Sequence, residues 1–239
     1  MNTVAVTADA SGGLEALLVC LQLSDSAFPS GFYTLSHSLE GYAQAKGVTA
    51  DTMPALLADL LRHAVGPGDA TALALAHQAA AAGQWQRLVE IDGRLLATKL
   101  NRELRLAATR TGRQLLDITQ ESITGRALDA FAERVAARQT PGCQAVVAGV
   151  AYAAAGVPRE RSVASDLFAF CASFVGAALR LRLTDHRKAQ VVLRQAAPVI
   201  SEATCAALKR DLSDMGGCVP LADVMSARHE RAEARLFAT

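Results

Sequence analysis

Apolar residues recur every three or four positions along most of this chain, and that spacing limits the possible folds more than any other feature. Within residues 53–64, one helix face is formed by Leu56, Leu57, Leu60, Leu61 and Ala64. Hydrophobic residues make up 51% of the chain but aromatic residues only 5%, so the core must be filled by Ala, Leu and Val. Because Ala and Leu are strong helix formers, we predict an all-α protein.

The chain is predicted to form a single compact domain of about nine to eleven helices with flexible N- and C-terminal tails. Residues 1–13 are small and polar and end in Ser-Gly-Gly, which is typical of a flexible tail. Residues 14–227 are assigned to the helical domain, and residues 228–239 to a C-terminal partner-binding tail.

Glycine and proline predict where some of the helices end. Gly66-Pro67-Gly68 is expected to break the helix that begins near residue 52. A helix is expected to reach Lys46 and to end at Gly47. Two separate helices are expected over 186–197 and 199–213.

Charge and cysteine patterns exclude several classes of protein. The 24 basic and 23 acidic residues give a net charge of +1, which leaves no strong field for nucleic acid or an anionic membrane. The five cysteines form no C-x-x-C pair, which is typical of free thiols in a reducing compartment. The first basic residue is Lys46, so the N-terminus lacks the positive region of a secretory signal. We therefore expect a cytoplasmic protein.

The longest uncharged segment lies between Arg138 and Arg159. Its length is close to that of a membrane span. It is rich in Ala and Gly, however, carries Gln144, and is bounded by Pro141 and Pro158. These features favour a central helix that is buried within the protein.

Motifs that carry chemistry are incomplete or missing. Neither G-x-x-x-x-G-K-[ST] nor G-x-G-x-x-G is present. The segment HERAE, residues 229–233, has only one of the two histidines of an H-E-x-x-H zinc helix. A helical metal-dependent hydrolase that uses His37, His186 or His229 is kept as an alternative, because distant segments can assemble a site. We assign no catalytic residue, metal ligand or cofactor site from the sequence.

The segment FPSGFYTLSHSLE, residues 28–40, interrupts the helical pattern. Pro29 biases Phe28 toward extended backbone, and Gly31 can adopt the positive φ of a sharp turn. Ser36 and Glu40 are predicted to share one helix face after the turn. This elbow is either a corner between helices or a docking surface, because a preformed loop serves both roles.

Two motifs at opposite ends of the chain resemble those of the urease accessory protein F family. The N-terminal motif is LSDSAFPSG at residues 23–31, followed by Tyr33, Ser36, Leu39 and Glu40. The C-terminal motif comprises PLAD at 220–223, SARHE at 226–230 and RLF at 235–237. Segments 101–105 and 165–183 also fit that family, so the resemblance covers nearly the whole chain.

The resemblance implies an all-α homodimer with no chemistry and no cofactor of its own. Members of the family bridge a GTPase, urease accessory protein G, and a scaffold, urease accessory protein D or H. The assembly delivers nickel to apo-urease, and nickel would meet this chain only transiently. No nucleic acid or membrane is implied. The residues that the resemblance places at partner surfaces are Asp25, Phe28, Pro29, Gly31, Tyr33, Ser36, Glu40, Arg228, His229, Glu230, Arg235, Leu236 and Phe237.

The C-terminal residues could bind either a partner or their own domain. Leu236 and Phe237 are apolar side chains on a short segment beside Arg235, which suits insertion into a groove of a partner. The alternative is that Phe237 folds back on its own domain. A helical scaffold in a different complex is also kept as an alternative, because fold does not determine function.

Overall fold

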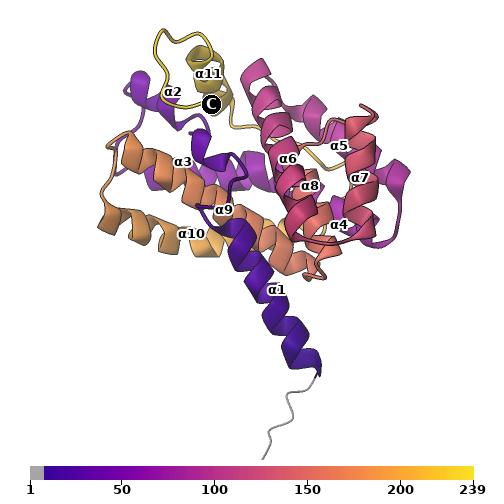
Figure 1. Cartoon of the computed structure of the whole chain (residues 1–239). Helices are drawn as coiled ribbons and strands as arrows, with labels where there is room; N and C mark the ends of the chain where they lie inside the picture. The colour runs from indigo at the N-terminus through magenta and orange to yellow at the C-terminus, as the bar shows by residue number, and fades with distance from the viewer. Residues whose placement is uncertain (1–7) are drawn as a thin grey trace, which may run out of the picture.

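The structure is a computed structural model, and it describes residues 8–239. These residues form helices joined by turns and loops, with no strand among them (Figure 1). This confirms the predicted all-α fold. The helices are α1 (Ala8–Ser24), the 3₁₀ turn η1 (Phe32–Thr34), α2 (Leu39–Gln44), α3 (Met53–Leu60), the π-helix η2 (Leu61–Ala70), α4 (Thr71–Ala81), α5 (Trp85–Thr98), α6 (Arg102–Ser122), α7 (Arg126–Ala136), α8 (Gln144–Ala154), α9 (Arg159–Arg180), α10 (His186–Ala207) and α11 (Pro220–His229).

The short helix α8 forms the centre of the domain. All residues from Gln144 to Tyr152 are buried, and α8 packs against α4, α6, α7 and α9. Small residues allow α4 to approach closely, because a Cβ atom at Gly149 would lie 2.6 Å from the carbonyl oxygen of Leu73. The prediction of a buried central helix in the uncharged segment is therefore confirmed.

The predicted break at Gly66-Pro67-Gly68 is wrong, because the helix continues from α3 through η2 into α4. Pro67 has no N–H to donate, and the wider π turn accommodates its ring. The hydroxyl of Thr71 donates to the carbonyl of Gly66 at 3.0 Å. The N–H of Gly216 donates to the carbonyl of Pro67 at 3.0 Å. Of these two backbone acceptors at the irregular turn, one is thus satisfied by a side chain of the same continuous helix and the other by a loop outside it.

The elbow differs from its prediction in one respect. Gly31 has the expected left-handed backbone, with φ of 90°, but His37 and Ser38 also have positive φ values of 55° and 71°. These two residues prevent a helix from forming before Leu39. Ser36 therefore lies outside α2 and does not share a helix face with Glu40, although its Oγ accepts a hydrogen bond from the N–H of Glu40 at 3.1 Å.

Two helices, α1 and α10, differ from their predicted bounds. Helix α1 begins at Ala8, so residues 8–13 of the predicted N-terminal tail are helical, and residues 1–7 lie outside the described residues. Helix α10 runs continuously through Pro198 instead of forming two helices. Figure 1 shows α1 extending from one side of the domain, whereas α11 and the C-terminus lie at the opposite side.

One helix of the described chain, α9, is long and apolar enough to span a membrane by length and composition. Within its most apolar window of 18 residues, 56% of the residues are buried inside the domain. Its buried residues include Leu167, Phe170 and Phe174. These contacts are those of a core helix in a helical domain.

Candidate interaction site between the N- and C-terminal motifs

The two motifs at opposite ends of the chain meet around one buried histidine. The imidazole of His229, on α11, is fully buried. Its Nδ1 lies 2.7 Å from Oε1 of Glu103 and its Nε2 lies 2.8 Å from Oε2 of Glu40. Because both carboxylates accept hydrogen bonds, a ring that donates to both must carry two protons. Helices α2, α6 and α11 are thereby joined through a single side chain.

The charges of this site balance. Burial alone would lower the pKa of His229, but the hydrogen bonds and charges of Glu103 and Glu40 outweigh it and raise the pKa. The second cation is Arg235, whose guanidinium lies 3.6 Å from Glu103 Oε1. The hydroxyl of Ser226 donates to the other oxygen of Glu103 at 3.0 Å. We refer to Glu40, Glu103, Ser226, His229 and Arg235 as the histidine cluster.

The C-terminal residues dock on the histidine cluster. The backbone N–H groups of Leu236 and Phe237 donate to the two oxygens of Glu40 at 2.8 and 2.9 Å. The ring of Phe237 is only 5% exposed, and the guanidinium of Arg180 lies 4.2 Å from its centre. The prediction of a flexible tail over 228–239 is therefore corrected, since Phe237 folds back on its own domain. Leu236 stays 62% exposed.

The segment beyond Phe237 pairs with the elbow. The N–H of Ala238 donates to the carbonyl of Thr34 at 2.8 Å, and the N–H of Ser36 donates to the carbonyl of Thr239 at 3.1 Å. The hydroxyl of Ser36 donates to that same carbonyl. Ser36 is buried, and its hydrogen bonds to Thr239 link the N-terminal motif to the end of the chain.

The predicted partner-binding residues divide into two groups. Ser36, Glu40, His229, Arg235, Leu236 and Phe237 converge, and Tyr33 joins them through Arg180, which also lies 3.9 Å from the tyrosine ring centre. The remaining predicted residues lie outside the histidine cluster; they are Asp25, Phe28, Pro29, Gly31, Arg228 and Glu230.

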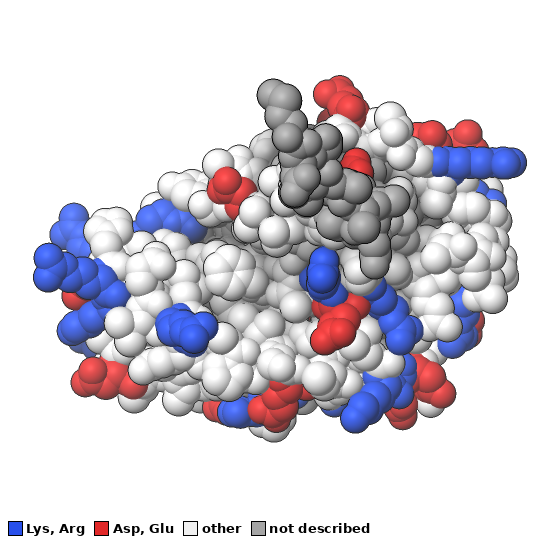
Figure 2. Space-filling view, turned by 90° about the horizontal axis from the view of Figure 1, so that it is seen from below, with Lys and Arg blue, Asp and Glu red and all other residues white. Residues whose placement is uncertain are grey.

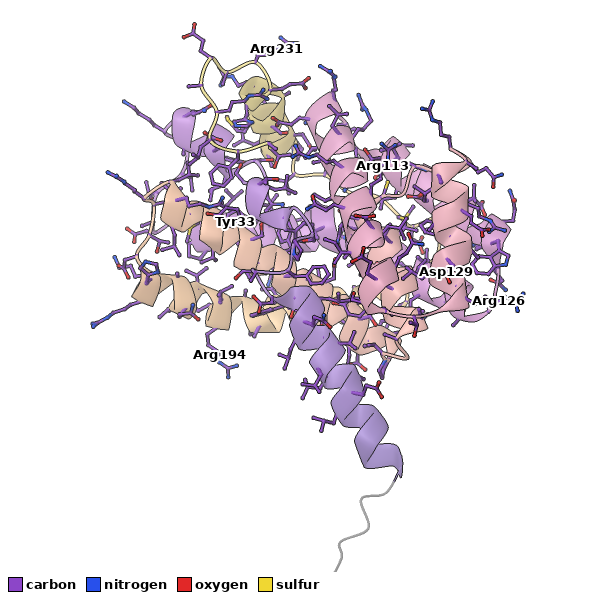
Figure 3. All side chains as sticks on the ribbon, viewed as in Figure 1. Tyr33, Arg113, Arg126, Asp129, Arg194 and Arg231 are labelled. Carbon is purple, nitrogen blue, oxygen red and sulfur yellow. The ribbon has the colours of Figure 1, made fainter. Side chains whose placement is uncertain are left out.

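Local roles explain several residues of the second group. Asp25 accepts a hydrogen bond from the N–H of Ala27 at 2.8 Å, which stabilises the turn before the elbow. Phe28 packs against the core, whereas Pro29 and Arg228 are exposed. In Figure 3, Tyr33 lies near the middle of the view, and Arg231 lies in the turn that follows α11.

Sequence reasoning did not assign roles to Glu103, Ser226 and Arg180. Glu103 stands in the first turn of α6, after the capping residue Asn101, whose side chain accepts from the N–H of Leu104 at 2.8 Å. An acidic residue is favourable at that position of any helix. The residue therefore has an ordinary local explanation, and its contact with His229 spans 126 positions.

The three histidines of the alternative hydrolase are not assembled into a metal site. Within residues 8–239, no group of three or more His, Cys, Asp or Glu side chains could hold a metal ion. His37 is held by the hydroxyl of Ser173 at 2.9 Å. Burial, together with Lys99 and Arg180, lowers the pKa of His37 to about 3, so its ring is neutral at physiological pH. His186 is exposed at the start of α10.

A cavity of about 150 Å³ adjoins the elbow and is lined in part by Ser38 and Thr239. Its polar wall includes the ion pair between Lys99 and Asp69, with Nζ and Oδ2 separated by 2.6 Å. Burial raises the pKa of the lining residue Asp166 to about 7, although a hydrogen bond from Gln144 opposes this shift. The cavity is large enough for several water molecules.

Comparison with known proteins identifies the family. A sequence model of the UreF family matches residues 48–197. The chain belongs to the UreF family. It is 30% identical over 240 residues to urease accessory protein UreF 2 of Brucella canis, covering 99% of this chain and 98% of that protein. It is 32% identical over 230 residues to urease accessory protein UreF of Azorhizobium caulinodans, covering 95% and 97% of the two chains.

A third relative extends the comparison. Urease accessory protein UreF of Bradyrhizobium diazoefficiens is 34% identical over 215 residues, covering 88% of this chain and 86% of that protein. The matches to these UreF proteins extend over nearly the whole chain, as the resemblance of its two motifs predicted. By their names, these relatives are urease accessory proteins.

Proposed function

We propose that this chain is a non-enzymatic chaperone that couples a GTPase, urease accessory protein G, to nickel insertion into apo-urease. Membership of the UreF family makes it an accessory protein of urease maturation. The coupling to the GTPase, the scaffold partner of type D or H, the homodimer and the cytoplasmic location are parts of the proposal. Nickel is treated as cargo of the complex, and no resident metal or cofactor is assigned to the chain.

The observation that carries the proposal is the docking of the C-terminal segment on the histidine cluster. Glu40 binds the backbone of Leu236 and Phe237, which holds the Leu236 side chain outward. Leu221 and Val224 on α11 are 54% and 51% exposed. We name these three residues, Leu221, Val224 and Leu236, the terminal surface. An apolar surface held by a buried polar network suits a preformed protein interface, because little ordering is needed on binding.

We assign the scaffold protein to the terminal surface. Apolar side chains in the centre of an interface supply most of its binding energy, while charged groups lie around them. Arg228 and Arg231 are exposed near the same helix and would form such a rim. The proposal therefore predicts that the scaffold presents an apolar groove with acidic residues at its edge.

The test is co-expression of this chain with accessory proteins D or H and G and with apo-urease. The variant V224D/L236D places two charges on the terminal surface. It should reduce co-purification of the scaffold at least about tenfold and reduce urease activation with it. The matched control is L106D, because Leu106 is a 55% exposed leucine on α6; this variant should behave as the wild type does.

Several outcomes would contradict the proposal or a part of it. Wild-type chain that fails to associate with the other accessory proteins, or that leaves urease activation unchanged, would remove the urease role. Capture of a different complex from the native host would support the alternative of a helical scaffold. Full binding by V224D/L236D would remove the terminal surface as the scaffold site.

A further inference from the structure

The cavity beside the elbow combines a largely apolar wall with a few charged groups. Residues of η2, α6, α9, α11 and the elbow line it. Its larger apolar side chains are Phe32, Leu35, Leu60, Val65, Leu104 and Phe170. A concave apolar site on which a few polar groups converge is the usual form of a small-molecule binding site. The charged groups of the wall therefore indicate which class of ligand the cavity suits.

The charged residues of the wall do not balance. Lys99 is paired with Asp69, with Nζ and Oδ2 separated by 2.6 Å, so this pair has no net charge. Asp166 and Asp223 also line the cavity, and neither forms an ion pair within residues 8–239. His37 lines it as well, and the pKa of about 3 leaves its ring neutral. The wall thus holds two carboxyl groups without a cation of their own.

These two carboxyl groups are buried with few hydrogen bonds. Asp166 is 8% exposed and accepts a hydrogen bond from Nε2 of Gln144 at 2.8 Å. Asp223 is half-buried, and its Oδ2 atom is buried without a hydrogen-bond partner among the described residues. Burial raises the pKa of both groups. Because a buried carboxylate without a partner is costly, both groups would stabilise a cation that enters the cavity.

The size and the opening of the cavity restrict the ligand further. A cavity of about 150 Å³ holds a molecule as large as benzene. Leu100 and Cys218 line the cavity and are exposed, so it opens to solvent at this edge. Within residues 8–239, no group of three or more His, Cys, Asp or Glu side chains could hold a metal ion. A small organic cation therefore fits the wall better than a metal ion does.

We propose that the cavity binds a small organic ammonium ion whose apolar body has about six to eight non-hydrogen atoms. The ammonium group donates hydrogen bonds to the carboxylates of Asp166 and Asp223, and the apolar body lies against Phe32 and Phe170. Aromatic rings also attract a cation that lies over their faces. The inference goes beyond the proposed function, because none of the residues of the terminal surface lines the cavity.

Apolar surface elsewhere on the protein lacks this combination of groups. In the view from below, a broad area without Lys, Arg, Asp or Glu lies to the left of the grey atoms, and most charged side chains gather nearer the rim (Figure 2). Such an area offers no charge that would orient a small ligand. The cavity, by contrast, encloses its ligand and supplies two carboxyl groups at defined positions.

The experiment is isothermal titration calorimetry of the full-length chain at neutral pH with three probes of similar size. These are benzylammonium, which is a cation, benzyl alcohol, which is neutral, and benzoate, which is an anion. Benzylammonium should bind at least about tenfold more tightly than benzyl alcohol, because a hydrogen bond between charged groups is stronger than one with a neutral donor. Benzoate should bind most weakly, because the wall repels it.

Two variants test the assigned carboxyl groups. D223N and D166N keep the shape of the side chain and remove the negative charge, so each should weaken the binding of benzylammonium at least about tenfold. Neither should change the affinity for benzyl alcohol to the same extent. The control D117N alters an exposed aspartate on α6 and should bind all three probes as the wild type does. Circular dichroism checks that each variant keeps the helical fold.

A further measurement locates the ligand without any variant. Cys218 and Cys205 are both exposed free thiols, but only Cys218 lines the cavity. Benzylammonium at about ten times its dissociation constant should slow alkylation of Cys218 by iodoacetamide at least about threefold. The rate at Cys205 should stay the same and serves as the internal control. Mass spectrometry of the two peptides measures both rates.

Several outcomes would overturn the inference. Absence of binding by all three probes would show that the cavity takes up water only. Equal affinities for benzylammonium and benzyl alcohol would remove the role of charge. Unchanged binding by both D223N and D166N, or binding that leaves the alkylation of Cys218 unchanged, would place the ligand elsewhere on the protein.

Discussion

Replacing His229 with glutamine tests whether the histidine cluster holds the C-terminal segment in place. The variant H229Q keeps a side chain that can donate and accept hydrogen bonds but removes the positive charge. Glu40 and Glu103, which are 5% and 4% exposed, would then face each other with Arg235 as the remaining nearby cation. Removing one partner of a buried ion pair typically costs about 3–5 kcal/mol.

The expected size of the loss follows from the usual cost of leaving a buried charge without its partner. We therefore expect H229Q to lower the free energy of unfolding by about 3 kcal/mol at pH 7. The measurement is urea denaturation followed by circular dichroism. The control is H63Q, because His63 is exposed on η2, and its effect should be within about 0.5 kcal/mol.

The effect should also depend on pH. The pKa of His229 is raised above its ordinary value of 6.5, so the folded state binds the proton more tightly than the unfolded state does. Its contribution is complete below pH 6.5 and is lost as the pH rises through the raised pKa. The difference between wild type and H229Q should therefore shrink on going from pH 6.5 to alkaline pH.

Amide exchange locates the change within the molecule. The N–H groups of Leu236 and Phe237 bind Glu40, so both should exchange faster in H229Q than in the wild type. A loss below about 1 kcal/mol together with unchanged exchange at these two amides would refute the assignment of a charged, bridging His229. So would a difference in stability that is the same at pH 6.5 and pH 9.

Three further substitutions test other parts of the fold, each by urea denaturation. D92A removes a buried carboxylate that accepts three hydrogen bonds from the loop 140–143, and it should cost about 3 kcal/mol; D92N, which keeps the shape, should cost less. D166N should stabilise the protein at pH 8 and have little effect on stability at pH 4. Burial raises the pKa of Asp166 to about 7, so ionisation of this carboxyl group lowers the stability of the wild type as the pH rises from 4 to 7. Equal effects of D166N at both pH values would contradict this reasoning. G149A should cost about 1–3 kcal/mol, because its methyl group would lie 2.6 Å from the carbonyl oxygen of Leu73, and a neutral result would show that α4 and α8 are not closely packed.

Helical periodicity was sufficient to predict the fold class, because each helix buries a face that can be read within one short segment. The leucines of α3 and the small residues of α8 are examples. The positions at which helices end were harder to predict. Pro67 lies in a helix that continues past it, because the surrounding structure supplies hydrogen-bond donors to the irregular turn. Local rules for proline do not include such distant donors.

The candidate site could be predicted only in part for a related reason. Glu40 and His229 were both selected by resemblance, but their contact joins positions 189 residues apart. Glu103 lies between them in the chain and carries an ordinary helix-start signal. Spacing along the sequence does not reveal that three helices bring these side chains together. Phe237 likewise packs against Arg180, which lies at the end of α9, far from Phe237 in the sequence.

The π-helical segment around Pro67 has a consequence for the loop that precedes α11. A regular α-helix would use the carbonyl of Pro67 within its own backbone ladder. The wider turn makes this carbonyl available to the N–H of Gly216, and Gly217 fits against it only because it has no Cβ. The loop tethered there leads directly into α11. The irregular helix segment Leu61–Ala70 therefore anchors the loop that leads into α11, the helix on which His229 lies between its two carboxylates.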